Sequence, residues 1–151
     1  MTGRGRALGI DVGARRVGLA ISDPSRTLAR PLSTLAVSGL ADAAARVARE
    51  IDQLEQELAH DEDRLALVVV GAPRRLDGSP SEQTPKVDAF VEALGARITL
   101  PIVREDERLS SLEADHRLSV SARDWRRRKA RLDAAAAAVI LQDYLDRHGP
   151  D

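Results

Sequence analysis

The residues best suited to chemistry are carboxylates that follow short apolar runs. Asp11 closes the first such run, and Gly13 comes two residues later. A carboxylate in that setting lies where a buried strand leaves its sheet, and the glycine lets a charged ligand approach the backbone. The pattern suits a metal ion or a phosphate. An Asx-turn, in which Asp11 only binds the turn amides, explains it equally well.

Asp133 is a second carboxylate with an unusual setting, because it lies on the apolar side of a predicted helix. The residues one to three turns further along that side are apolar: Ala136, Ala137, Ile140 and Tyr144. A carboxylate facing inward is costly unless a partner compensates it. The alternative is that Asp133, one residue into the helix, stabilises the helix dipole. That alternative does not explain the inward direction, so a functional role is favoured.

A third group of acids lies at the end of a later apolar run. The side-chain period of a strand places Glu105 and Glu107 on one side and Asp106 on the other. Only one side can face a shared site. For at least one of these acids, a salt bridge with Arg104 or Arg108 is the expected role.

The combination of acids predicts a hard cation. Three carboxylates from separate elements, without His or Cys companions, favour Mg²⁺ or Mn²⁺. The three histidines are scattered without zinc spacing, and neither a Walker lysine nor a G-x-S-x-G motif is present. Acids, a divalent metal and surrounding arginines indicate phosphodiester hydrolysis, in which two ions about 3.5–4 Å apart can hold the attacking and leaving oxygens.

The elements that must position these acids can be predicted from hydrophobic patterns. Their order predicts an α/β domain with three antiparallel strands, then two parallel strands, and helices on both faces of the mixed sheet. Ligands bind such sheets beyond the carboxyl ends of the strands, where all three acidic elements would lie. We expect a hairpin over 7–23 and an edge strand over 26–37 that is interrupted by Pro31. A helix over 40–59, a central strand over 65–70 and a helix over 85–95 capped by Thr84 should follow. The last elements expected are a strand over 98–103 that continues into the acids, a short helix from Ser110 or Ser111 to Leu118, and a helix over 132–147.

Composition limits the remaining possibilities. The 151 residues suit one domain, 1–151, with a core of its own. The absence of cysteine fits a reducing cytoplasm, and no apolar run resembles a membrane span or a signal peptide. The net charge of −1 gives no global attraction to nucleic acid, and three aromatic residues argue against a base-stacking RRM or OB module.

Nucleic-acid binding must therefore come from local basic clusters. The strongest is the run 123–131, which holds six basic residues and leads directly to Asp133. We predict a mobile arm that grips backbone phosphates through shape and not sequence, against the usual alternative of a solvated loop or helix end. Trp125 could wedge against a distorted base or be buried in the domain. The candidate nucleic-acid-binding residues are Arg15, Arg16, Arg74, Arg75, Arg126, Arg127, Arg128 and Lys129.

Together these motifs resemble the YqgF, or RuvX-like, family of RNase H-like proteins. Its members are described provisionally as nucleases that mature the 5′ end of pre-16S ribosomal RNA and as Holliday junction resolvases. The resemblance implies an acidic triad of Asp11, Glu107 and Asp133, and it selects Glu107 among the three acids of its strand. Ala72 departs slightly from the family pattern, which has a Leu or similar residue there. The matching segments span nearly the whole chain: 8–13, 16–20, 22–23, 69–73, 77–78, 106–110 and 133–141.

Other functions stay open beside the nuclease. A sugar-kinase or actin-type ATPase shares the strand–Asp–Gly hairpin, but it needs two such domains and this chain has room for one. A non-catalytic scaffold of this fold would more plausibly have lost one of the acids. The sequence does not separate branched DNA from precursor ribosomal RNA as substrate. A resolvase, which cuts two strands symmetrically, would most simply be a homodimer.

Overall fold

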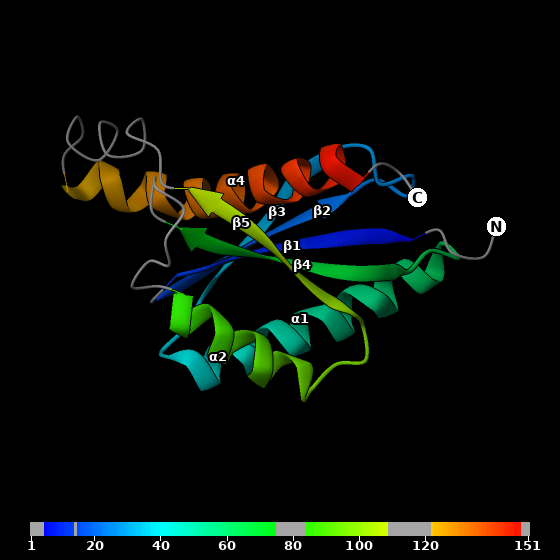
Figure 1. Ribbon diagram of the computed structural model, residues 1–151, viewed down its shortest axis with the longest axis horizontal. Helices are drawn as coiled ribbons and strands as arrows, with labels where there is room; N and C mark the ends of the chain where they lie inside the picture. Colours follow the sequence, from blue (N-terminus) through cyan, green and yellow to red (C-terminus); the bar gives the residue numbers. More distant parts are fainter. Residues whose placement is uncertain (1–4, 14, 75–83, 109–121, 149–151) are drawn as a thin grey trace.

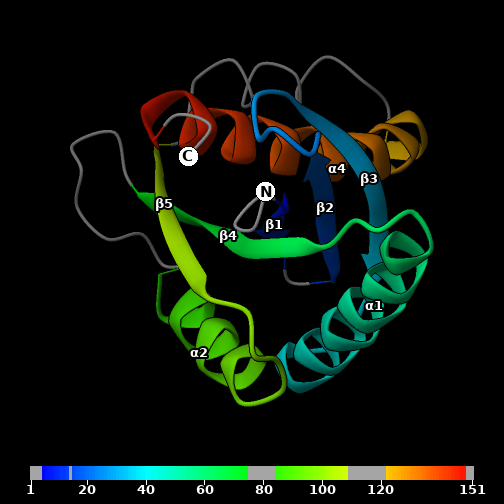
Figure 2. The same cartoon turned by 90° about the vertical axis from the view of Figure 1, so that its right-hand side faces the viewer.

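The computed structural model describes the backbone of residues 5–13, 15–74, 84–108 and 122–148, and the side chains of 5–13, 15–71, 85–105 and 133–148. One five-stranded sheet organises the chain, in the order β3-β2-β1-β4-β5. Helix α4 covers one face of this sheet and helices α1 and α2 cover the other (Figures 1 and 2). The elements are β1 Arg6–Val12, β2 Arg16–Ser22, β3 Ala29–Ala36, α1 Leu40–His60, β4 Leu65–Arg74, α2 Thr84–Gly95, β5 Ile102–Arg108 and α4 Ala122–His148.

The strand directions confirm the predicted mixed sheet. Strands β1, β2 and β3 pair antiparallel, whereas β4 runs parallel to both β1 and β5. The apolar run 65–70 forms the first part of β4, as expected for a strand covered on both faces. Strand β3 is the sheet edge, and the pairing register shifts where Ala20 meets Pro31. A proline is tolerated at such an irregularity because its missing amide donor removes no central ladder bond.

Alternation along the strands divides the core in two. Leu8 and Ile10 of β1 face α1 and α2, and pack there against residues such as Val47 and Phe90. Ala7, on the other side of β1, packs under α4. The α4 side of the sheet carries small residues, so this helix lies close to the strands, and the positions of its side chains relative to β1 and β2 are tightly determined.

Several predicted boundaries were wrong. Strand β3 begins at Ala29, three residues later than expected, and β4 continues four residues past the predicted end, to Arg74. The last strand begins at Ile102 and not at Ile98, because Ile98 still belongs to the turn that ends α2 and donates its amide to the Leu94 carbonyl at 3.2 Å. The last helix begins at Ala122, ten residues earlier than expected. The segment 122–131 contains neither Gly nor Pro, and its Ala, Arg and Lys are good helix formers, so the backbone stays helical without an apolar stripe. The predicted short helix ending at Leu118 lies outside the described residues.

Candidate active site

Asp11 and Asp133 approach each other from the sheet and from α4. Asp11 is near the end of β1 and lies opposite Gly18 of β2 in the register. Opposed residues of an antiparallel pair place their side chains on the same face. A β-carbon added to Gly18 would meet the backbone of Asp133 and Ala134, including the Ala134 nitrogen at 2.9 Å. The Asp11 side chain is therefore on the face that α4 covers, at the strand pair nearest to Asp133.

Asp133 is in the interior of its helix, so the helix dipole does not explain it. Eleven residues, or about three turns, separate it from Ala122 at the start of α4. Only 17% of its side chain is exposed, and Ala137 and Ile140 on the same helix face are buried in the core. The alternative interpretation of Asp133 as an acid in the first helical turn is thus wrong, and the inward direction of this carboxylate is confirmed.

Arg16 compensates the partly buried charge of Asp133. Its Nε lies 3.6 Å from Asp133 Oδ2, and 28% of the Arg16 side chain is exposed. Arg16 starts β2 directly after the turn that follows Asp11, and its carbonyl accepts a hydrogen bond from the Gly13 amide at 2.9 Å. The β1–β2 hairpin therefore carries both the Asp11 carboxylate and the Arg16 guanidinium next to Asp133. Arg15, its neighbour, is exposed at the turn and accepts the Val37 amide at its carbonyl.

Glu105 has a structural partner outside its own strand. Its side chain is 5% exposed, and its Oε2 lies 2.7 Å from Nη1 of Arg147, near the end of α4. Arg104 pairs with Asp88 of α2 at 2.5 Å. The expected salt bridge between one of the three acids and Arg104 or Arg108 stays a prediction, because the side chains of 106–108 lie outside the described ones. The ion pair of Glu105 with Arg147 thus links β5 to α4. It explains why an acid is buried here, so Glu105 needs no ligand to compensate its charge.

Glu107 follows in the same strand, and its backbone lies opposite Pro73 of β4. The side chains of Glu107 and Asp106 lie outside the described ones, so the structure does not test their place in the site. Among the side chains that are described, no three His, Cys, Asp or Glu residues gather as a cation site. The structure therefore places Asp11 and Asp133 on facing elements next to Gly18, and the metal site formed with Glu107 stays a prediction.

The basic run is the first part of α4. Figure 1 shows these turns projecting past the sheet on the side where the β4 and β5 arrows end. The run is helical and continuous with Asp133, and the predicted role of this segment in gripping phosphates stays a prediction. The side chains of Arg126, Arg127, Arg128 and Lys129, like those of Arg74 and Arg75, lie outside the described ones.

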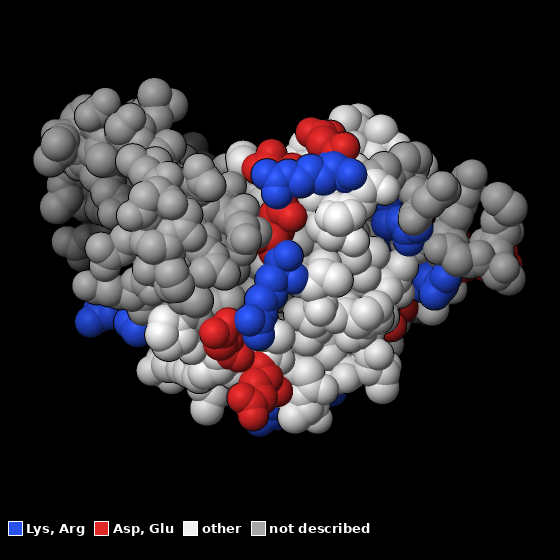
Figure 3. All heavy atoms as spheres, in the orientation of Figure 1, with Lys and Arg blue, Asp and Glu red and all other residues white. Residues whose placement is uncertain are grey.

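The described surface carries charges of both signs. Figure 3 shows acidic and basic side chains interleaved across one face of the molecule, with large uncharged areas beside them. This arrangement fits the ion pairs of β5, in which Arg104 and Glu105 bind Asp88 and Arg147 respectively. Paired charges offer little net attraction to a polyanion, so the arginines near the hairpin and in the first part of α4 stay the candidates for phosphate contacts.

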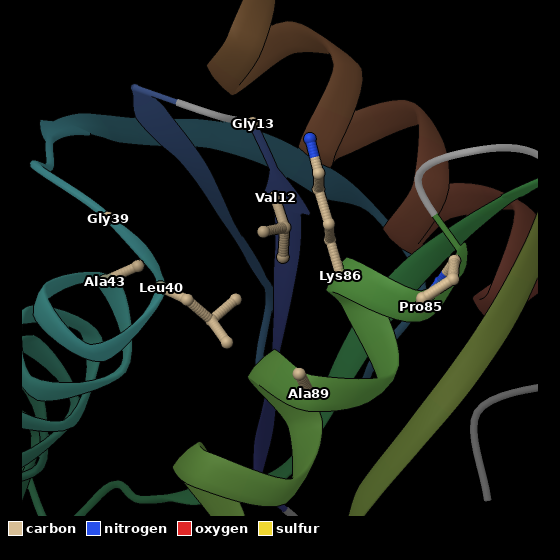
Figure 4. Close-up of a pocket in the computed structure, with 8 residues that line it drawn as sticks. All are labelled: Val12, Gly13, Gly39, Leu40, Ala43, Pro85, Lys86 and Ala89. Atoms are coloured by element: carbon tan, nitrogen blue, oxygen red, sulfur yellow. The ribbon is translucent and has the colours of Figure 1, made fainter.

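A pocket on the other face of the sheet was not anticipated from the sequence. It has a volume of about 400 Å³ and opens between the β1–β2 turn and the first turns of α1 and α2 (Figure 4). No sequence pattern could reveal it, because its walls come from three separate elements. The lining residues are Val12, Gly13, Gly39, Leu40, Ala43, Pro85, Lys86 and Ala89.

Comparison with known proteins places the chain in a family. Residues 5–147 match the model of RuvX, described as Holliday junction resolvase. The chain belongs to the RuvX family. A relative from Anaeromyxobacter dehalogenans is 40% identical over 148 residues, which cover 96% of this chain and 99% of the relative. One from Roseiflexus is 36% identical over 142 residues and 94% of each chain. Both carry pre-16S rRNA nuclease as a provisional name.

The fold of this RuvX protein also matches that of a known resolvase. RuvC of T. thermophilus, solved in complex with a Holliday junction substrate, is 15% identical and superimposes with a TM-score of 0.50 over 97% of each chain. At that identity the likeness shows the RNase H-like fold alone. Among the described residues, no helix is long and apolar enough to cross a membrane.

Proposed function

We propose that this protein is a metal-dependent endonuclease that hydrolyses phosphodiester bonds in the precursor of 16S ribosomal RNA, with its whole chain acting as one domain. The observation that carries the proposal is the convergence of Asp11 and Asp133 beneath α4, in a chain whose relatives bear the name of that activity. Such a nuclease would work in the cytoplasm, where ribosomes are assembled.

The residues present fit a Mg²⁺ or Mn²⁺ site. Asp11 and Asp133 offer carboxylate oxygens, the donors that these hard cations prefer, and Gly18 lets the backbone of Asp133 pack directly against β2, next to Asp11 in the register. We assign Glu107 as the third ligand, because Glu105 is held by Arg147. When bound, the metal supplies an activated water and stabilises charge on the phosphoryl oxygens.

Arg16 and the basic side chains would orient the substrate. Arg16 lies beside Asp133, and its planar guanidinium suits a bidentate contact with a phosphate. A phosphate at the hairpin would attract Arg16 away from Asp133 and leave that carboxylate for the cation. Arg15 at the turn and the first part of α4 would hold flanking phosphates, which fix the register of the nucleic acid without reading its sequence.

The decisive experiment compares cleavage of precursor 16S RNA with cleavage of a four-way DNA junction, in the presence of Mg²⁺ or Mn²⁺. We expect the wild-type protein to cut precursor 16S RNA near its 5′ end, and excess EDTA to abolish the cut. Asp11→Asn should abolish cleavage yet melt no lower than wild type, since one of two neighbouring like charges is removed. Asp52→Asn, on the exposed side of α1, is the matched control and should cut normally. Undiminished cleavage by Asp11→Asn would refute the mechanism.

A second candidate is resolution of four-way DNA junctions during recombination and repair. The description of the family model favours it. A resolvase must make two symmetric cuts, so this activity predicts a homodimer in solution. The same assay, run with a synthetic junction beside the RNA, separates the two functions. Paired symmetric cuts in the junction, together with a dimeric mass by light scattering, would favour the resolvase.

A further inference from the structure

The pocket between α1 and α2 has the chemistry of a nucleotide subsite. Its walls are apolar, with Val12, Leu40 and Ala89 among them, and the one ionisable side chain among its lining residues is Lys86. Figure 4 shows the Lys86 amine extending from α2 toward the turn that contains Gly13. An apolar cavity with a single cation at its mouth suits a ligand that has a flat, weakly polar body and an anionic group.

The geometry of β1 places the pocket next to the proposed active site, on the opposite face of the sheet. Asp11 and Val12 are consecutive residues of this strand, so their side chains point to opposite faces. Asp11 faces α4, whereas Val12 lines the pocket with Gly13 of the following turn. A polynucleotide that crosses the turn would thus have one phosphate beside Asp11 and a neighbouring nucleotide above the pocket.

We propose that this pocket receives one unstacked base of the substrate strand next to the scissile phosphate, while Lys86 contacts the phosphate of that nucleotide. The inference rests on the proposed nuclease function and adds a substrate class to it. A base is available at low cost only where the strand is unpaired or distorted. The substrate is therefore a single-stranded or locally unpaired segment, as opposed to a regular duplex.

The apolar walls determine what the pocket can distinguish. Side chains such as Leu40, Ala43 and Ala89 can contact the faces of any base but offer no hydrogen bonds to its edges. The pocket should therefore require that a base is present without selecting which one. Aliphatic walls hold a base less strongly than aromatic side chains that stack on it, so we expect removal of the base to weaken binding by about tenfold and not more.

The test uses a series of precursor RNA segments, each with one abasic nucleotide at a different position around the cut. For wild type, we expect one abasic position to lower kcat/KM about tenfold, chiefly through KM, and the other positions to have little effect. Ala89→Leu, which fills the pocket, should lower kcat/KM similarly on intact RNA and cause no further loss on that abasic RNA. Ala59→Leu makes the same change on an exposed part of α1 and should behave as wild type.

Variants of Lys86, and binding measurements with Asp11→Asn, separate an effect on RNA binding from effects on folding and on cleavage. Lys86→Met removes the charge of an exposed side chain and should weaken binding and its salt dependence, whereas Lys86→Arg should restore both. Anisotropy measurements of the same RNA series with Asp11→Asn report the base requirement without cleavage. Intact RNA left uncut by wild type would refute the proposed function alone. Equal binding of intact and abasic RNA at every position would overturn the pocket proposal.

Discussion

Gly18→Ala should separate the two acids of the proposed site without changing any charge. Gly18 lies opposite Asp11 in the sheet and beneath Asp133 of α4. A β-carbon at this position would be 2.9 Å from the Ala134 nitrogen and closer still to the Asp133 carbonyl oxygen. Both groups are helix backbone, so the overlap cannot be relieved by rotating a side chain.

The size of the effect follows from that overlap. A comfortable contact for a methyl carbon is about 3.5–4 Å, so the Ala134 nitrogen alone requires a shift of roughly 0.6–1 Å. The Asp133 carbonyl oxygen is nearer, so the helix backbone must move by at least about 1 Å. Such overpacking costs about 1–3 kcal/mol of folding free energy. A displacement of about 1 Å at reacting groups costs on the order of 100-fold in rate. We therefore expect a folded protein with a lower melting temperature and about 100-fold lower kcat on precursor RNA.

Two other glycines serve as controls for this substitution. A β-carbon at Gly71 would meet the Ile140 side chain, most closely its terminal Cδ1, and no backbone atom is among its three nearest neighbours, so Gly71→Ala should retain more activity than Gly18→Ala. Gly95→Ala should be neutral, since its nearest neighbour would be 3.8 Å away. Thermal denaturation and RNA cleavage by all three variants are the assays. Wild-type activity in Gly18→Ala would contradict the placement of Asp133 against β2.

Three further predictions concern charged groups. Arg16→Gln should bind Mn²⁺ several-fold more tightly in the absence of RNA, by titration calorimetry, because it removes the cation beside Asp133. Partial burial raises the pKa of Asp23, but hydrogen bonds from Ser25 and from the Leu28 and Thr27 amides outweigh it and lower this pKa from 3.8 to about 2. The stability that Asp23 contributes is thus present above pH 4 and lost as the pH falls toward 2. In urea denaturation, Asp23→Asn should have a free energy of unfolding lower than that of wild type by at most about 1 kcal/mol at pH 6, after allowance for solvent screening. This difference should vanish at pH 2. Neutralising Arg126, Arg127 and Arg128 should leave stability nearly unchanged, and should flatten the salt dependence of RNA binding by up to roughly 0.7–0.9 per lost phosphate contact.

The parts of the fold that the sequence revealed are those with strong local patterns. The β-branched run of β4 has one plausible structure, a strand buried on both faces, and it forms one. Ile98 shows the opposite case. It is apolar and close to β5, yet its amide is used to end α2 and its side chain packs at the margin of the core. Hydrophobicity indicates burial at such positions but does not distinguish a strand from a turn.

The start of α4 illustrates a different limit. Periodicity predicts a helix from Leu132, because the apolar stripe begins there. The sequence of the preceding turns contains no such stripe, and Figure 1 shows these turns projecting beyond the sheet. Intrinsic propensity alone extends the helix back to Ala122. That extension changes the interpretation of Asp133 from a residue in the first turn to one in the interior of a long helix.

The acids of β5 show why a site is harder to predict than a fold. Period two placed Glu105 and Glu107 on one side of the strand, and local pairing offered Arg104 or Arg108 as partners. The partner of Glu105 is instead Arg147, forty-two residues later, and only the packing of α4 on the sheet brings them to 2.7 Å. A buried carboxylate that already has a cation at 2.7 Å loses that interaction if it turns to a metal. Glu105 is therefore poorly suited to exchange ligands during a reaction, which supports the assignment of Glu107 to the proposed metal site.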